Sequence, residues 1–425
     1  MKVLMINSVC GIGSTGRICT DLAQEFERDG HEVKIAYGRD ENVPEKFRKY
    51  AVQIGTAMDV KLHGALTRIF DAHGFGSKKA TKKFLKWAEE YKPDLLWLHN
   101  IHGYYINIEM LFAWIKKHPE MEVKWTLHDC WAFTGHCSHF TVAGCDKWKT
   151  QCGHCIQKQE YPASKVIDNS KNNYVRKKSA FTGVKKMTII TPSKWLADLV
   201  KQSFLSEYPV EVHYNKIDTS IFKPTPSDFR ERYGLEGKKI ILGVASVWTE
   251  RKGLGDFIEL AKMLDDRYAI VLVGLSKEQI AEVPEKFNDI KQIENTNENV
   301  TIYCSGEKND NLKASLNKKE ASQDNKYILQ NENGVVISAG IEHLYRAIVG
   351  CEADTEMRNN VLVVDRLICI QRTNNAAELA EIYTASDYFV NPTYEDNYPT
   401  VNLEAVACGT YVITYDTGGC RETIN

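Results

Sequence analysis

The clearest candidates for chemistry are two carboxylates separated by seven residues, Asp396 and Glu404, within "PTYEDNYPTVNLEAVACGTYVI" (392–413). A strand is expected to end near Thr393, and Pro399 fits the first turn of the next helix, where its missing N–H is not needed. Asp396 would then lie in the loop and Glu404 on the helix. Carboxylate oxygens accept hydrogen bonds from hydroxyl groups, so this pair predicts a site for a sugar-like ligand.

The start of the same helix is a candidate anion site. The backbone N–H groups of Thr400 and Val401 would face the helix mouth, where unpaired amides and the helix dipole favour phosphate. The alternative interpretation is structural: Asp396 or Asn397 caps the helix, and Glu404 is a solvated helical residue.

A second candidate phosphate loop lies near the N-terminus. Gly11, Gly13 and Gly16 in "SVCGIGSTGRI" (8–18) follow a short apolar run and fit the pattern G-x-G-x-x-G. Glycines at a strand-to-helix turn let the backbone approach a phosphate closely. The NAD version of this loop requires an acid after the second strand, and Asp40 meets that requirement. An NAD-dependent oxidoreductase and a tight turn without a ligand are therefore both alternatives.

Three histidines follow predicted strands. His99 and His102 lie in "LHNIHGYY" (98–105), and His128 follows the next strand, directly before Asp129. Ligands of open α/β sheets bind at such strand ends. We expect His128 to be the functional member, and the alternative for each histidine is an ordinary hydrogen-bonding role.

A cysteine-rich segment (130–157) follows. Cys137, Cys145, Cys152 and Cys155 could supply a tetrahedral structural zinc site. Such a site can contribute about 10–16 kcal/mol to folding. Free thiols and disulfides are the alternatives. Three histidines could replace a cysteine as ligand: His136, His139 and His154.

A basic segment, "GSKKATKKFLKW" (76–87), combines lysines at helical spacing with apolar side chains. Its lysines are Lys78, Lys79, Lys82, Lys83 and Lys86, and its apolar residues are Phe84, Leu85 and Trp87. The segment is either a solvated helix face or a peripheral contact with an anionic membrane, which would suit a lipid-linked acceptor.

The elements that position these residues follow from the alternation of short apolar runs with amphipathic stretches, which predicts an α/β fold with parallel sheets. The first series of expected strands is 2–9, 31–38, 93–100, 123–129 and 187–193, with a helix at 15–29. The second series is 238–246, 268–275, 367–372, 388–393 and 411–416. Two such series predict two Rossmann-like domains facing each other across a cleft.

The predicted domains are residues 1–214 and 238–425. They are joined by a linker at 215–237, which contains two prolines and shows no regular period of apolar residues. An asparagine-rich insertion at 285–366 interrupts the second domain, and "GVVISAGIEHLYRAIV" within it predicts a strand followed by a helix. The chain stops at Asn425, soon after its last strand, so we expect that C-terminal elements of the fold are missing.

The composition limits the function. A formal net charge of -2 for the whole chain does not favour binding to nucleic acid. No run of about 18 apolar residues is present, and the N-terminus lacks the layout of a signal peptide. These features predict a cytoplasmic protein whose thiols are kept reduced.

The acidic stretch resembles that of retaining GT-B glycosyltransferases of family 4 (group 1), in which two acids separated by seven residues precede EA-x-A-x-G. The resemblance implies that Asp396 contacts the donor sugar and Glu404 the nucleotide ribose. The first acid is usually Glu in the family, so Asp396 is a departure, and Glu395 takes its place if the loop carries one extra residue. "ERKGLGDFIELA" is similar to the phosphate-binding segment of the family, which implies that Arg251 and Lys252 contact the donor diphosphate.

The basic pair should dominate the binding of the diphosphate. A helix end contributes about 0.3–1 kcal/mol to anion binding, whereas a charge-assisted hydrogen bond contributes about 1.5–3 kcal/mol. A further arginine of the family falls at Ser246 or Val247 here, and Lys216 stands where the linker of the family usually has glycine. The alternative for Arg251 and Lys252 is a solvated loop charge.

The resemblance covers 1–283 and 367–425 and excludes the insertion. It implies that His128 lies near the reacting sugar, that Gly13 and Gly16 close on the donor phosphates or the acceptor, and that catalysis requires no metal. The predicted function is transfer of a sugar, with retention, from a nucleotide-diphosphate donor to a glycan or lipid-linked acceptor in polysaccharide biosynthesis. A non-catalytic nucleotide-sugar-binding protein and an oxidoreductase are the alternatives.

Overall fold

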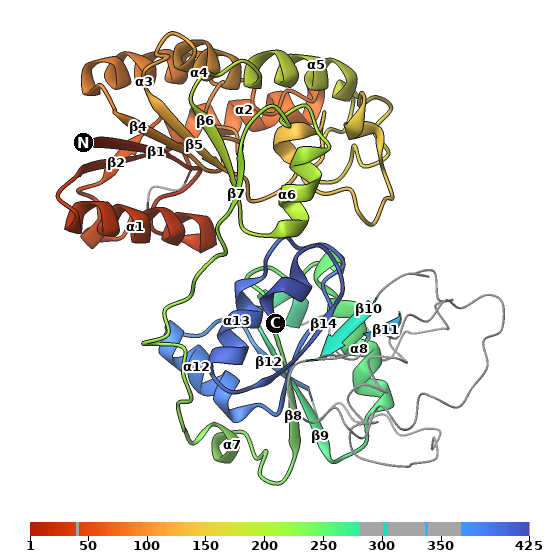
Figure 1. Cartoon of the computed structure of the whole chain (residues 1–425). Helices are drawn as coiled ribbons and strands as arrows, with labels where there is room; N and C mark the ends of the chain where they lie inside the picture. Colours follow the sequence, from red (N-terminus) through yellow and green to blue (C-terminus); the bar gives the residue numbers. More distant parts are fainter. Residues whose placement is uncertain (40–41, 281–300, 305–335, 339–366, 425) are drawn as a thin grey trace. The chain divides into compact units, whose positions relative to one another are not determined.

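The computed structural model describes residues 1–39, 42–280, 301–304, 336–338 and 367–424 (Figure 1). The chain divides into two units, Met1–Asn215 and Lys216–Asn425, and each contains its own sheet. The predicted α/β class with two Rossmann-like domains is confirmed by the order of the strands in both sheets.

The first unit contains a sheet of seven parallel strands in the order β3-β2-β1-β4-β5-β6-β7. This is the order of Rossmann folds, and the chain reverses its direction of winding between β1 and β4. The strands are β1 (Lys2–Ile6), β2 (Glu32–Tyr37), β3 (Ala51–Gln53), β4 (Leu95–Leu98), β5 (Glu122–Thr126), β6 (Met187–Thr191) and β7 (Val210–Val212). All five predicted strands are present, and β3 and β7 are additional three-residue strands at or near the edges of the sheet.

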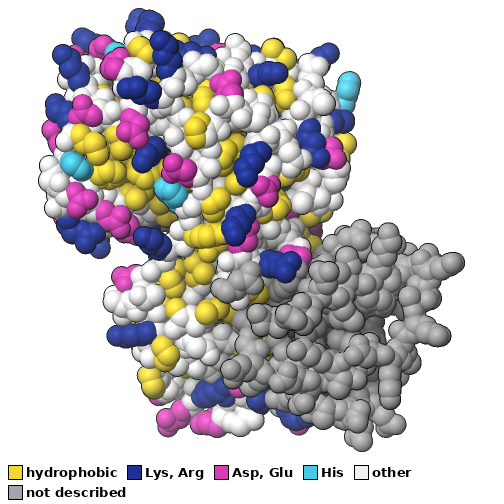
Figure 2. Space-filling model, in the orientation of Figure 1, with side chains coloured by type: hydrophobic (Ala, Val, Ile, Leu, Met, Phe, Trp, Pro, Cys, Tyr) yellow, Lys and Arg dark blue, Asp and Glu magenta, His cyan; other side chains and the backbone are white. Residues whose placement is uncertain are grey.

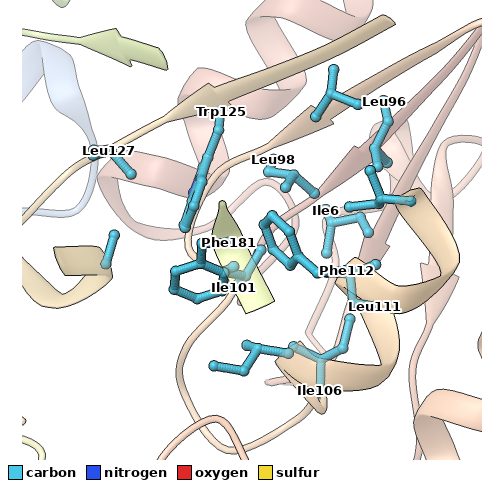
Figure 3. Close-up of a cluster of buried hydrophobic side chains, with 14 of the residues drawn as sticks. Ile6, Leu96, Leu98, Ile101, Ile106, Leu111, Phe112, Trp125, Leu127 and Phe181 are labelled. Atoms are coloured by element: carbon cyan, nitrogen blue, oxygen red, sulfur yellow. The ribbon is translucent and has the colours of Figure 1, made fainter. Parts of the chain in front are cut away.

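Helices cover both faces of this sheet, because alternate residues of a strand point to opposite faces. Leu4 and Ile6 of β1 belong to one buried cluster, whereas Val3 and Met5 pack with helix α1 in another. Figure 3 shows part of the first cluster, where Phe112 and Phe181 lie close to Trp125. The helices are α1 (Gly13–Arg28), α2 (Ala57–Phe70), α3 (Lys78–Tyr91), α4 (Ile108–Ile115), α5 (Ser170–Phe181) and α6 (Lys194–Lys201).

The second unit contains a sheet in the order β11-β10-β14-β13-β8-β9-β12. Five strands are parallel: β8 (Lys239–Val244), β9 (Tyr268–Val273), β12 (Leu367–Ile370), β13 (Tyr388–Asn391) and β14 (Tyr411–Tyr415). Their order again reverses, here between β8 and β13. The helices in the described part are α7 (Phe229–Arg232), α8 (Leu254–Met263), α12 (Ala376–Ala385) and α13 (Thr400–Ala407).

The insertion contributes to the second sheet. Its strands β10 (Thr301–Cys304) and β11 (Val336–Ser338) are antiparallel and pair beyond β14. The strand predicted in "GVVISAGIEHLYRAIV" is therefore confirmed at β11, while the predicted helix and Asp40 lie outside the described residues. The segment predicted as a linker packs into the second unit through Phe222, Phe229 and Leu235.

Candidate functional site

The predicted donor-binding residues of the second unit converge on the reversal point of its sheet. A short 3-10 helix, η4 (Glu250–Lys252), follows β8, and the acidic loop (392–399) follows β13. Because β8 and β13 are neighbours, these two segments lie side by side at the carboxyl edge. Open α/β sheets bind their ligands at this position.

Lys252 and Asp396 form an ion pair at this point, with 2.5 Å between Nζ and Oδ2. Both side chains are about a quarter exposed, at 23% and 22%, so the pair is accessible to a ligand. Arg251 donates to the carbonyl oxygen of Glu395, and its own carbonyl oxygen accepts from the N–H of Tyr394 at 2.9 Å. The structure thus joins in one unit the cation that was predicted for the diphosphate and the acid that was predicted for the sugar.

Two glycines allow the close approach of these segments. Gly253 has φ +73°, and a Cβ there would overlap the carbonyl oxygen of Pro392. Gly418 has φ +58°, and a Cβ there would overlap the carbonyl oxygen of Asp396, which also accepts from the N–H of Gly419 at 3.2 Å. Only glycine satisfies both the backbone conformation and the space. Gly418 therefore sets the position of the acidic loop.

Helix α13 begins at Thr400, so Pro399 is the residue before the helix and not a member of its first turn. Thr400 and Val401 occupy the first two helical positions, where a backbone N–H has no acceptor within the helix. Glu404 lies on the second turn, and its Oε2 accepts from the hydroxyl of Tyr383 on α12 at 3.1 Å. The tyrosine holds this carboxylate in a fixed orientation.

Sequence reasoning missed a partly buried carboxylate that contacts the acidic loop. Asp256 on α8 accepts from the hydroxyls of Tyr394 and Tyr415, at 3.0 Å and 2.9 Å. Burial raises the pKa of Asp256 to about 6, although both tyrosines act in the opposite direction. The position of Asp256 in the first turn of a helix gave it the pattern of a surface residue, so nothing in the sequence singled it out.

In the first unit, the predicted glycine loop joins β1 to α1. Gly11 and Gly13 have φ +72° and +62°, and α1 begins at Gly13. Asn7, which is fully buried, donates to the carbonyl oxygen of Val9 at 2.8 Å and accepts from the N–H of Asn100 at 3.2 Å. This residue was also missed, and it ties the glycine loop to the loop that carries the histidines.

The three predicted histidines lie together after β4 and β5. His128 and His99 contact each other through Nε2 and Nδ1 at 3.2 Å. His102 instead pairs with Asp129, with 3.0 Å between Nε2 and Oδ2, and its Nδ1 lies 3.4 Å from the hydroxyl of Tyr161. These residues other than Tyr161 line a small cavity with room for about one water molecule.

Burial determines the charge of this cluster. It lowers the pKa of His128 to about 4 and that of His99 well below its ordinary value, with a further contribution from each neighbouring histidine. Burial alone would raise the pKa of Asp129, but His102 and the N–H of Trp131 outweigh it, and the pKa is lowered. Near pH 7, His128 and His99 are therefore neutral and Asp129 is charged.

The first unit is expected to lose stability in mild acid. The pKa of His63, like that of His128, is lowered from 6.5 to about 4 by burial. The unfolded chain therefore binds protons at these residues before the folded chain does, and the free energy of unfolding falls as the pH drops from about 6.5 to 4. A difference of one in the pKa of a group between the folded and unfolded chains changes the free energy of unfolding by about 1.4 kcal/mol.

Urea unfolding followed by tryptophan fluorescence at several pH values measures this dependence. The variant His128→Asn should show a shallower fall than the wild-type chain, and His213→Asn, at an exposed position, is the matched control for the loss of a histidine. Equal slopes for His128→Asn and the wild-type chain would contradict the assignment.

The four predicted zinc ligands are free cysteines in the structure. Cys137 and Cys155 hydrogen-bond to each other, and Cys152 accepts from the N–H of Gly135 at 3.2 Å. Within the described residues, no group of three or more His, Cys, Asp or Glu side chains is arranged to hold a metal ion. A structural zinc stays a prediction, for which metal analysis of the purified protein is the test.

The basic segment on α3 does not offer the apolar surface that was expected of it. Phe84 is buried, and Trp87 stacks on Tyr91, so these side chains pack into the core of the first unit. On the face that Figure 2 shows, cations and anions are interspersed over the first unit. In the described parts of the chain, no helix is long and apolar enough to cross a membrane.

Two Rossmann-like units, each with a parallel sheet whose strand order reverses, are the architecture of the GT-B fold. The family model of "Glycosyltransferase Family 4" matches residues 15–221, and that of "Glycosyl transferases group 1" matches residues 355–425. The chain therefore belongs to the family 4, group 1 glycosyltransferases.

A curated relative is the putative colanic acid biosynthesis glycosyl transferase WcaC of Escherichia coli (strain K12), which is 28% identical over 208 residues. The match covers 47% of this chain and 50% of the relative, so the chain spans about half the length of the curated relative that it matches.

Solved structures show the same fold. Sucrose-phosphate synthase from Thermosynechococcus elongatus is 14% identical, with a TM-score of 0.56, over 100% of this chain and 83% of that chain. Anabaena HepE in complex with UDP is 13% identical, with a TM-score of 0.55, over the same shares.

Proposed function

We propose that this protein transfers a sugar from a nucleoside-diphosphate sugar to a glycan or lipid-linked acceptor, with retention of configuration, in polysaccharide biosynthesis. The observation that carries the proposal is the accessible pair of Lys252 and Asp396 beside Arg251 at the start of α13. The name of the E. coli relative and the UDP complex of Anabaena HepE support the class of reaction and of donor.

The chemistry follows from charge. Cleavage of the bond between sugar and diphosphate leaves negative charge on the departing phosphate oxygens. Lys252, Arg251 and the amides of Thr400 and Val401 would stabilise that charge, because preorganised donors act most strongly where charge develops. In the structure, the carboxylate of Asp396 accepts a hydrogen bond from the Lys252 ammonium. A bound donor diphosphate would compete for this ammonium, and the carboxylate would then accept a hydrogen bond from a sugar hydroxyl.

The histidine cluster would serve the sugar and the acceptor. His128 is neutral near pH 7 and can donate or accept a hydrogen bond at a hydroxyl. His102, whose ring Asp129 holds in place through Nε2, is a candidate to orient the acceptor hydroxyl. Gly13 and Gly16 shape the loop that would close on the donor phosphates or the acceptor.

A panel of nucleoside-diphosphate sugars tests the proposal. Incubation with the correct donor and acceptor should release the nucleoside diphosphate, and the variant Glu404→Ala should weaken donor binding about 10–100-fold, as expected for a lost charged hydrogen bond of about 1.5–3 kcal/mol. Isothermal titration calorimetry measures the affinity, and Glu236→Ala, at an exposed position of the same unit, is the control.

Nucleotide binding without sugar release would favour a non-catalytic binding protein. Binding of NAD instead of UDP or GDP would contradict the proposal and favour an oxidoreductase.

A further inference from the structure

Helix α2 has its polar side inside and its apolar side outside. His63, Gly64 and Thr67 are its buried residues, whereas Met58 and Leu62 are 70% and 61% exposed. Helices on the surface of a globular protein normally bury their apolar face. The reversed arrangement indicates that the outer face of α2 contacts something other than water.

The buried polar side is fully accommodated, so the reversal is not a local misfit. Nδ1 of His63 contacts the hydroxyl of Ser77 at 2.9 Å, and its Nε2 accepts from the N–H of Gly76 at 3.1 Å. Thr67 donates to the carbonyl oxygen of His63 at 3.0 Å. Because the contacts of His63 with Ser77 and Gly76 hold this side of the helix inward, Met58, Leu62 and Ile69 face outward.

The exposed residues form one stripe. Met58, Leu62 and Ile69 recur at the i, i+4, i+11 spacing of a single helix face. A neighbouring segment widens this stripe, because the N–H of Ile167 donates to the carbonyl oxygen of Ile69 at 3.1 Å. We define the α2 apolar face by its six exposed residues: Met58, Leu62, Ile69, Phe70, Val166 and Ile167.

Cations accompany this face. Lys61 and Arg68 are exposed on α2, and Lys165, whose N–H donates to the carbonyl oxygen of Arg68 at 2.7 Å, is exposed beside them. An apolar helix face bordered by Lys and Arg is typical of helices that lie in the interface of an anionic membrane. A symmetric pairing of two copies through this face would instead bring cations of the same kind together.

We propose that the α2 apolar face binds the surface of an anionic lipid bilayer, with the six side chains in the acyl boundary and the three cations at the headgroups. This moves the expected membrane contact from the lysine-rich α3 to α2. The helix ends just before His73, whose ring lies 5.6 Å from the rings of both His102 and Tyr161. If the proposed function holds, a lipid-linked acceptor would reach the histidine cluster from this surface.

Vesicle flotation tests the membrane contact without any sugar substrate, so its result is independent of the proposed sugar transfer. The full chain should bind vesicles of phosphatidylcholine mixed with phosphatidylglycerol. The double variant Leu62→Asp, Ile69→Asp should bind at least about tenfold more weakly, because both residues leave the apolar stripe. The matched double control Val142→Asp, Val175→Asp introduces the same two charges at exposed apolar positions outside the face and should bind as the wild-type chain does.

A second variant separates charge from apolar contact. Lys61→Glu, Arg68→Glu should weaken binding to the anionic vesicles, whereas Lys79→Glu, Lys83→Glu on α3 should have a much smaller effect. Circular dichroism and thermal melting confirm that each variant is folded. Wild-type binding by the Leu62→Asp, Ile69→Asp variant, absence of wild-type binding to the vesicles, or a dimer in light scattering that this variant dissolves would each overturn the proposal.

Discussion

Replacement of Lys252 by methionine is expected to lower the rate of sugar transfer about 10²–10³-fold, the range found when one preorganised donor to a developing negative charge is removed. Methionine keeps much of the length of the side chain but lacks the ammonium group that pairs with Asp396 in the structure. The loss should fall mainly on kcat, because the charge on the leaving diphosphate is greatest in the transition state.

Steady-state kinetics with the donor identified in the nucleotide-sugar panel measures this effect. Lys262→Met is the matched control, since Lys262 lies in the last turn of α8 and pairs with Glu259 at 3.3 Å. A Lys252→Met enzyme with the kcat of the wild-type chain would show that the diphosphate binds elsewhere.

Replacement of Gly418 by alanine is expected to abolish productive donor binding. The left-handed backbone of Gly418 would cost alanine about 1–2 kcal/mol, and the new methyl group would also overlap the carbonyl oxygen of Asp396. The acidic loop must then move away from Lys252, so we expect nucleotide affinity to fall by more than about tenfold.

Nucleotide titration measures the loss of affinity, and thermal melting measures the loss of stability separately. Gly255→Ala is the control, because Gly255 is in α8 and a Cβ there meets no atom within 4 Å. Alanine at this helical position should keep donor affinity and raise stability by about 0.5–1 kcal/mol. Normal affinity in Gly418→Ala would contradict the role of this glycine in placing the loop.

Most of the main strands were predictable because they contain a short apolar run, as in "YAIVLVGL" (268–275), which became β9. Parallel strands buried on both faces produce such runs. The short strands β3 and β7 were not predictable, since three residues give no periodic signal and their pairing with β2 and β6 depends on the rest of the sheet.

The candidate site was predictable in its residue types and not in its contacts. Lys252 and Asp396 were each identified from their local motifs, but they are 144 positions apart, and only the adjacency of β8 and β13 brings them together. Asp256 and Asn7 have no local motif, so their roles emerge only from buried hydrogen bonds.

The same limit applies to the histidines. The sequence favoured His128, yet in the structure the carboxylate of Asp129 pairs with His102, because the loops after β4 and β5 lie side by side. For α2, the sequence shows apolar residues at helical spacing, and it cannot show that the opposite, polar side of the helix is the one that is buried.

The pairing of β9 with β12 bears on how the second domain tolerates its long insertion. These strands are hydrogen-bonded over four residue pairs although about 90 positions separate them in sequence, so the insertion leaves and rejoins the sheet between direct neighbours. A short crossover could join the same two strands and keep the five-stranded parallel core, in which Lys252 and Asp396 meet. Shortening the insertion would therefore alter the sheet beyond β14, where β10 and β11 pair, and leave the order of the five parallel strands unchanged.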